Sequence, residues 1–151
     1  SALEEGKADV LGLYMVTRLH EKGELGDAEL MDNYVTFLGS IFRSIRFGAA
    51  SAHGVANVVR FNFFLDEGAF VRDAETGRYS VDFERMETAI TNLSRLLLTL
   101  QGDGNYEGAK ELTEGKGIIS PTLKGDLDRL SEAGIPVDIT FRQGVEELGL
   151  N

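Results

Sequence analysis

Residues 83–100 read FERMETAITNLSRLLLTL, and this stretch has the most regular hydrophobic pattern in the chain. Its apolar residues recur at alternating three- and four-residue steps, the period of one face of an α-helix. They are Phe83, Met86, Ile90, Leu93, Leu97 and Leu100. Asp82, directly before them, is typical of a helix N-cap. The stretch predicts a long amphipathic helix and favours a helical domain.

On both sides of this stretch, similar patterns predict helices over 3–20, 27–47 and 50–65. A shorter helix is expected to end near Glu114 and Gly115, and Pro121 is expected to open a last one. Residues 69–72 and 78–81 flank a turn-forming Thr76-Gly77 pair and predict a β-hairpin, while 137–141 alternate like a short strand. Because no repeat or linker interrupts the chain, we expect a single, mainly α-helical, bundle-like domain over 1–151 with a small hairpin and a short C-terminal strand.

The composition excludes several classes of protein. The 151 residues match the size of one compact domain, and the net charge of −10 opposes binding to nucleic acid. The absence of cysteine excludes a disulfide framework and a thiolate nucleophile, which suits the cytoplasm. No apolar stretch reaches the roughly 20 residues that span a bilayer. We therefore expect a cytoplasmic protein with neither nucleic acid nor membrane as a partner.

Three acidic residues, Glu4, Glu5 and Asp9, open the first predicted helix. Carboxylates near a helix N-terminus interact favourably with the helix dipole, and this is the ordinary explanation. However, Glu5 and Asp9 are four residues apart and share a helix face, and the small Ala8 beside them leaves room for a bulky group. The pattern therefore also fits a metal ligand with a neighbouring hydrogen-bond acceptor.

The run EEGKADVLGLY over residues 4–14 closely resembles the second signature motif of the dipeptidyl-peptidase-III family of zinc metallopeptidases. The resemblance implies a zinc cofactor, a peptide substrate and Glu5 as a zinc ligand. It implies that Glu4 and Asp9 hold the zinc-binding histidines by hydrogen bonds. Those histidines belong to an upstream HExxGH motif, which is absent from this sequence.

The missing motif and the start at Ser1 lead us to expect the C-terminal part of a larger catalytic domain, inactive without the N-terminal part of the same chain. The full-length protein would then be a metallopeptidase. Some bacterial members of the family carry a Nudix domain ahead of the peptidase-like region. The resemblance therefore makes a bacterial, Nudix-linked homologue one expected arrangement.

A polar stripe of His53, Asn57 and Arg60 marks the predicted helix 50–65, whose other faces are apolar. A buried, hydrogen-bonded structural histidine is the ordinary explanation. The resemblance instead implies that His53 is catalytic and contacts the substrate or its transition state, with Asn57 and Arg60 binding substrate. The dipeptidyl peptidases have arginine at the position of Asn57. A neutral amide cannot supply that charge, which argues against dipeptide-releasing specificity.

A rival function comes from residues 103–114, whose acidic spacing imitates a calcium-binding EF-hand loop. The matching residues are Asp103, Asn105, Glu107, Gly108 and Glu114. Lys110 stands where such loops have an apolar residue, and the apolar spacing across the segment is helical. The alternative function is a non-catalytic helical binding or interaction module that responds to calcium.

Overall fold

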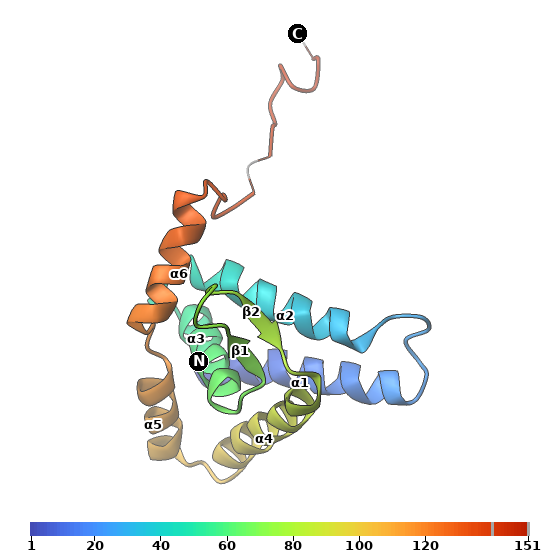
Figure 1. Cartoon of the computed structure of the whole chain (residues 1–151), viewed down its shortest axis with the longest axis vertical. Coiled ribbons are helices and arrows are strands. Elements are labelled where there is room, and N and C mark those ends of the chain that lie inside the picture. The colour runs from blue at the N-terminus through green and yellow to red at the C-terminus, as the bar shows by residue number, and fades with distance from the viewer. Residues whose placement is uncertain (140, 151) are drawn as a thin grey trace.

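The structure, a computed structural model, describes residues 1–139 and 141–150. The described part consists of helices joined by short loops, with one two-stranded hairpin (Figure 1). The elements are α1 (Ala2–Glu21), α2 (Leu30–Ile45), α3 (Ala52–Asp66), β1 (Phe70–Arg72), β2 (Tyr79–Val81), α4 (Phe83–Gly102), α5 (Tyr106–Lys116) and α6 (Pro121–Glu132). The predicted class, mainly α-helical with a small hairpin, is confirmed.

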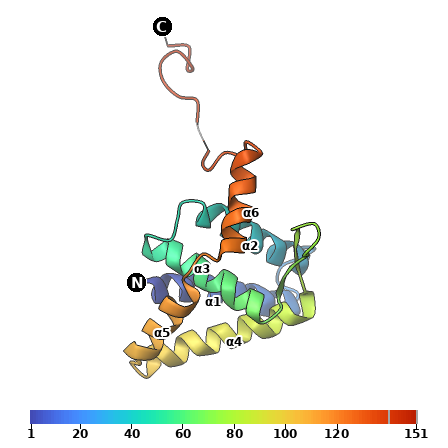
Figure 2. The same cartoon turned by 60° about the vertical axis from the view of Figure 1, so that its left-hand side comes forward.

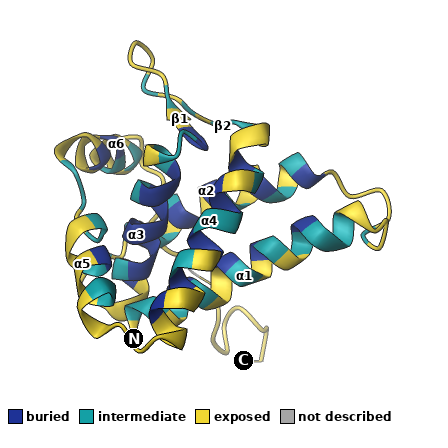
Figure 3. Ribbon diagram, turned by 90° about the horizontal axis from the view of Figure 1, so that it is seen from below, coloured by how far each residue is buried: buried dark blue, intermediate teal, exposed yellow. Residues whose placement is uncertain are grey.

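Helix α3 forms the centre of the domain and contacts α1, α2, α4, α5 and β1. Nine of its fifteen residues are buried, which is the result expected for a helix that is apolar on most of its circumference. Figure 3 shows the buried residues running along α3 and along the inward faces of α1, α2 and α4. The aromatic rings of Phe61 and Phe64 on α3 pack against Phe70 of β1. The core therefore joins the helices to the hairpin.

The hairpin is antiparallel, with Phe70 opposite Val81 and Arg72 opposite Tyr79. Gly77 in its turn has a φ of +67°, a conformation that glycine adopts without steric cost. The predicted hairpin is therefore confirmed, and its turn chemistry explains where it reverses.

The helix ends agree with the sequence in some places and differ in others. The Asp82 side chain accepts a hydrogen bond of 3.0 Å from the Arg85 backbone N–H, as expected for the N-cap of α4. The expected N-cap at Asp27 is wrong: α2 begins at Leu30 after Glu29, because the turn around Gly26 extends through Asp27. At the other end of the chain, α5 continues through Gly115 to Lys116.

Asp82 caps a helix and Asp27 does not, so the same substitution should affect stability differently at the two positions. Asp82→Ala should lower the free energy of unfolding by about 1 kcal/mol, because the first turn of α4 loses its side-chain acceptor. Asp27→Ala should have a much smaller effect, since Asp27 lies in a turn and caps no helix. Urea denaturation of both variants followed by circular dichroism measures the difference. Equal losses would show that the cap does not stabilise α4.

The C-terminal segment after α6 first contacts the end of α2, where Arg46 donates to the carbonyls of Ile135 and Pro136, and then leaves the body of the domain (Figures 1 and 2). The strand expected over 137–141 is not formed at residues 137–139 or 141, and Thr140 lies outside the described residues. A strand requires a neighbour for its backbone hydrogen bonds. In the described part of the chain the only strand pair is β1 with β2, and residues 137–139 and 141 are exposed.

None of the described helices combines the length and apolar character needed to cross a membrane.

Candidate functional site

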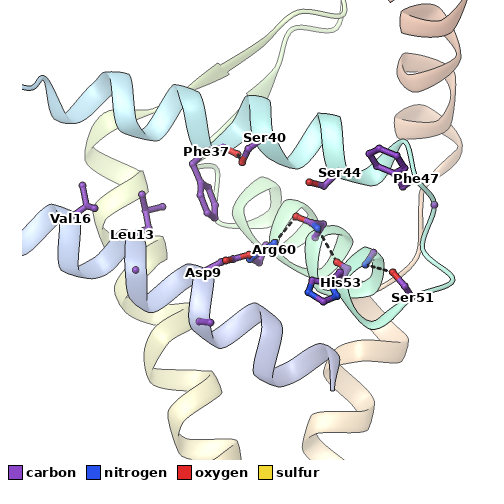
Figure 4. Close-up of a pocket in the computed structure, with 15 residues that line it drawn as sticks. Asp9, Leu13, Val16, Phe37, Ser40, Ser44, Phe47, Ser51, His53 and Arg60 are labelled. Carbon is purple, nitrogen blue, oxygen red and sulfur yellow. Dashed lines mark hydrogen bonds and ion pairs between the residues drawn. The ribbon is translucent and has the colours of Figure 1, made fainter. Parts of the chain in front are cut away.

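A cavity of about 610 Å³ lies between α1, α2 and α3 (Figure 4). Three helices and one loop supply its walls, and small side chains on all of them leave the space open. The lining residues are Ala8, Asp9, Gly12, Leu13 and Val16 of α1; Phe37, Ser40 and Ser44 of α2; Phe47, Gly48 and Ser51 between helices; and His53, Gly54, Asn57 and Arg60 of α3. Most residues of the predicted polar stripe and acidic motif therefore lie at one place.

The close approach of α1 to α3 brings these groups together. Gly6 of α1 is buried, and a Cβ atom added to it would lie 3.8 Å from the Cβ of Ala56 on α3. Small residues at a helix contact allow the two backbones to lie near each other. The glycine in the acidic motif thus places the neighbouring carboxylates of Glu5 and Asp9 against α3.

Glu5 and His53 are in direct contact at the mouth of the cavity. Glu5 Oε2 lies 3.0 Å from His53 Nε2, although the two residues are 48 positions apart in the sequence. The His53 side chain is 74% exposed and that of Glu5 is 38% exposed. The interpretation of His53 as a buried structural histidine is therefore wrong, and both groups are open to a ligand.

Arg60 lies deeper, where its side chain is 4% exposed. Its Nη1 atom donates to Asp9 Oδ2, and its Nη2 atom donates to Asn57 Oδ1 at 2.5 Å. Asn57 in turn donates from Nδ2 to the backbone carbonyl of His53 at 2.9 Å. Since a buried cation is stable only when paired and hydrogen-bonded, Asp9 and Asn57 compensate the burial of Arg60.

The structure separates Glu4 from the other predicted site residues. Its side chain is 72% exposed, and its carboxylate lies 3.7 Å from the N-terminal nitrogen of Ser1. Glu5, Asp9, His53, Asn57 and Arg60 form one connected group, and all of them except Glu5 line the cavity. The roles assigned to these six residues, as zinc ligand, histidine partners, catalytic group and substrate-binding groups, stay predictions.

The donor set for a metal is incomplete in the described part of the chain. A catalytic zinc site generally takes three protein ligands and an open position. Residues 1–139 and 141–150 bring together no group of three or more His, Cys, Asp or Glu side chains that could hold a metal ion. Glu5 and His53 therefore do not form a zinc site by themselves.

The prediction of an EF-hand-like calcium-binding loop over residues 103–114 is wrong. Residues 106–116 form α5, with Asn105 as its N-cap, so the expected binding loop is a helix. Its Asn105 side chain accepts a hydrogen bond from the Gly108 backbone N–H at 2.9 Å and is used for capping.

The α2 wall of the cavity was not predicted from the sequence. Phe37, Ser40 and Ser44 follow one another at steps of three and four residues on α2, which is a second helical stripe beside the apolar one, and Phe47 continues the same spacing just after the helix ends. The available signal was this spacing of two serines between two phenylalanines.

A second polar cluster, also unpredicted, joins the hairpin to α6. Asp126 of α6 accepts hydrogen bonds from Arg72 Nε at 2.7 Å, Arg72 Nη2 at 2.9 Å and the Tyr79 hydroxyl at 2.8 Å. The hydrogen bonds from Arg72 lower the pKa of Asp126, and burial raises the pKa of Tyr79. Asp126 is 7% exposed, and its partners Arg72 and Tyr79 belong to the hairpin strands. The cluster therefore fastens α6 to the domain.

The geometry thus defines a mainly helical domain with a carboxylate–imidazole pair at the mouth of an interhelical cavity. Its fold is similar to that of part of two solved dipeptidyl-peptidase III (DPP III) chains. The solved DPP III of Caldithrix abyssi aligns with a TM-score of 0.89 and 39% sequence identity, over 97% of this chain and 28% of that chain. The solved dipeptidyl-peptidase III of Corallococcus sp. strain EGB gives 0.84 and 39% identity, over 93% of this chain and 26% of that one.

The chain is also similar in sequence to a longer protein from a plant. Nudix hydrolase 3 of Arabidopsis thaliana is 41% identical over 140 residues, which are 93% of this chain and 18% of the plant protein. No protein-family model matches the chain. The chain therefore has a DPP III-like, peptidase-related fold and spans less than a third of each of these longer proteins.

Proposed function

We propose that this chain forms the C-terminal part of the catalytic region of a zinc-dependent peptidase. The observation that carries the proposal is the 3.0 Å contact between Glu5 and His53. The chain that makes this contact has a DPP III-like fold and 39% sequence identity to the solved DPP III chains. The two side chains come from different helices and meet at an exposed cavity mouth. A peptide lying along that mouth would contact both.

In the proposed reaction Glu5 is a zinc ligand, and the remaining ligands come from residues outside this chain. When bound, zinc polarises the scissile carbonyl and activates water. His53, whose imidazole is largely exposed, donates a hydrogen bond to the oxygen on which negative charge develops. Glu4 and Asp9 are accessible to hold the zinc-binding histidines, since their side chains are 72% and 57% exposed.

The match to Nudix hydrolase 3 favours a second arrangement of the longer protein. In that arrangement the present segment belongs to a chain that also carries a Nudix hydrolase region. The peptidase proposal concerns only the region containing Glu5 and His53. The two activities are therefore separable by substitutions at these residues.

The test uses the longer protein, assayed with zinc against peptides of several lengths. Glu5→Gln should reduce hydrolysis at least about 100-fold and release the bound zinc, because an amide is a weaker metal ligand than a carboxylate. Glu132→Gln, the same change at an exposed position of α6, is the matched control and should leave both unchanged. Zinc content by elemental analysis gives a readout independent of activity.

Full zinc content and activity in Glu5→Gln would contradict the proposed role of Glu5. The isolated 151-residue chain should hydrolyse no peptide at any zinc concentration, because its donor set is incomplete. Turnover by the isolated chain would contradict the proposal that the other ligands lie outside it.

A further inference from the structure

The charges in the cavity wall are already paired with each other. Asp9 and Arg60 form an ion pair, and the second terminal nitrogen of Arg60 is bonded to Asn57. Asn57 Nδ2 also donates a hydrogen bond to the backbone carbonyl of His53. Because Asp9 and Arg60 neutralise each other, a charged ligand group in this cavity would find no net counter-charge on this pair.

Two of the three serine hydroxyls in the wall are similarly engaged. Ser40 donates to the Phe37 carbonyl at 2.7 Å, and Ser51 accepts from the Gly54 backbone N–H at 3.1 Å. Polar atoms that are satisfied internally offer little to a polar ligand. Ser40 and Ser51 are therefore used within the wall itself.

The remaining wall is apolar. Leu13, Val16 and Phe37 line one side of the cavity, and Phe47 lies on the opposite side (Figure 4). The volume of about 610 Å³ is within the range of small-molecule sites and exceeds that of one amino-acid side chain. Burial of apolar ligand surface against these side chains would be favourable, whereas an unpaired charge would lose its hydration without compensation.

We propose that this cavity is a specificity site that takes an uncharged, apolar side chain of a peptide. The inference rests on the proposed function for the statement that the ligand is a peptide. The selection against charge comes from the pairing of Asp9 with Arg60. His53 at the mouth would then lie beside the backbone of the residue whose side chain enters the cavity.

Binding can be measured on the 151-residue chain by amide chemical shifts in nuclear magnetic resonance. The probes are N-acetyl-leucine amide, N-acetyl-lysine amide and N-acetyl-glutamate amide. The leucine probe should shift the amides of Gly12, Ser44 and Gly54 saturably, with an affinity at least about tenfold higher than either charged probe.

Two glycine substitutions test whether the cavity is the site. Gly12→Leu places a side chain in the cavity, and Gly39→Leu makes the same change on α2 away from it. A Cβ atom at either glycine meets no atom within 4 Å, and both lie within helices, so both variants should fold. Gly12→Leu should weaken binding of the leucine probe at least about tenfold, while Gly39→Leu should retain it.

A third variant tests the origin of the charge selection. Asp9→Asn removes the carboxylate that neutralises Arg60, and it keeps one side-chain oxygen that can accept a hydrogen bond from the Arg60 guanidinium. The glutamate probe should then gain affinity about tenfold, because Arg60 has lost its anionic partner.

Three results would overturn the inference: no saturable shift with the leucine probe, equal affinity for charged probes, or undiminished binding in Gly12→Leu. None of them bears on peptide hydrolysis by the longer protein, which is decided by Glu5→Gln. Failure of the specificity site and failure of the proposed peptidase are therefore distinguishable.

Discussion

Phe64→Ala should lower the free energy of unfolding by about 4 kcal/mol. Phe64 lies on α3 with 0% of its surface exposed, and its ring centroid is 5.2 Å from that of Phe70 and 6.0 Å from that of Phe37. Alanine would remove the apolar surface and leave a cavity where α2, α3 and β1 meet. Because three elements border that space, they cannot all move to close it.

Urea denaturation monitored by circular dichroism measures this loss. Phe141→Ala is the matched control, since Phe141 is 73% exposed and should contribute close to nothing. Similar stabilities for the two variants would show that the ring of Phe64 is not part of the cooperative core.

The same packing connects the core to the candidate site. Phe37 packs edge-on against Phe64, lines the cavity, and lies 5.6 Å from the guanidinium carbon of Arg60. The position of the cavity wall therefore depends on the core behind it. Phe64→Ala should also shift the amide resonances around Phe37.

Local patterns account for the parts of the fold that the sequence predicts well. Residues 83–100 repeat their apolar residues for five turns, and Asp82 meets every requirement of a cap. Asp27 has the same side chain, but Gly26 beside it has a φ of +60° and prolongs the turn, so capping fails. Cap chemistry alone does not tell which aspartate begins a helix.

The site was predictable where a motif marked it and unpredictable where it depends on distant pairs. The motif at 4–14 predicts Glu5 and Asp9 as site residues, and the polar stripe predicts His53 and Arg60. The pairing of Asp9 with Arg60 spans 51 residues, and that of Arg72 with Asp126 spans 54. No local periodicity contains such pairs, because they arise only when the helices pack.

Asp126→Asn should detach α6 from the domain, at a cost of about 3 kcal/mol to its attachment. Only Leu123 and Asp126 of α6 are buried, so this carboxylate is a large part of what fastens the helix. An amide at this position would present N–H groups to the N–H groups of Arg72. The amide keeps one acceptor oxygen but loses the other and the negative charge, so Arg72 and Tyr79 would be left with fewer acceptors and no counter-ion.

Hydrogen exchange of the α6 amides measures the detachment against those of α4, which should keep their protection. Asp128→Asn is the matched control on the same helix: Asp128 is 57% exposed and pairs with Lys124 four residues earlier, so its loss should cost less than about 0.5 kcal/mol. Equal protection of α6 in both variants would show that Asp126 is not the fastening group.

The pH dependence of α6 follows from the same hydrogen bonds. The donors on Arg72 lower the pKa of Asp126 in the folded protein below the value of about 3.9 typical of an unfolded chain. A group with a lowered pKa in the folded state contributes its full stability above the unfolded pKa and loses it as the pH falls through the folded pKa. Exchange from α6 should therefore accelerate below about pH 4 relative to α4. Asp126→Asn removes the titrating group, so its α6 should exchange rapidly at neutral pH and lack this acid-dependent step.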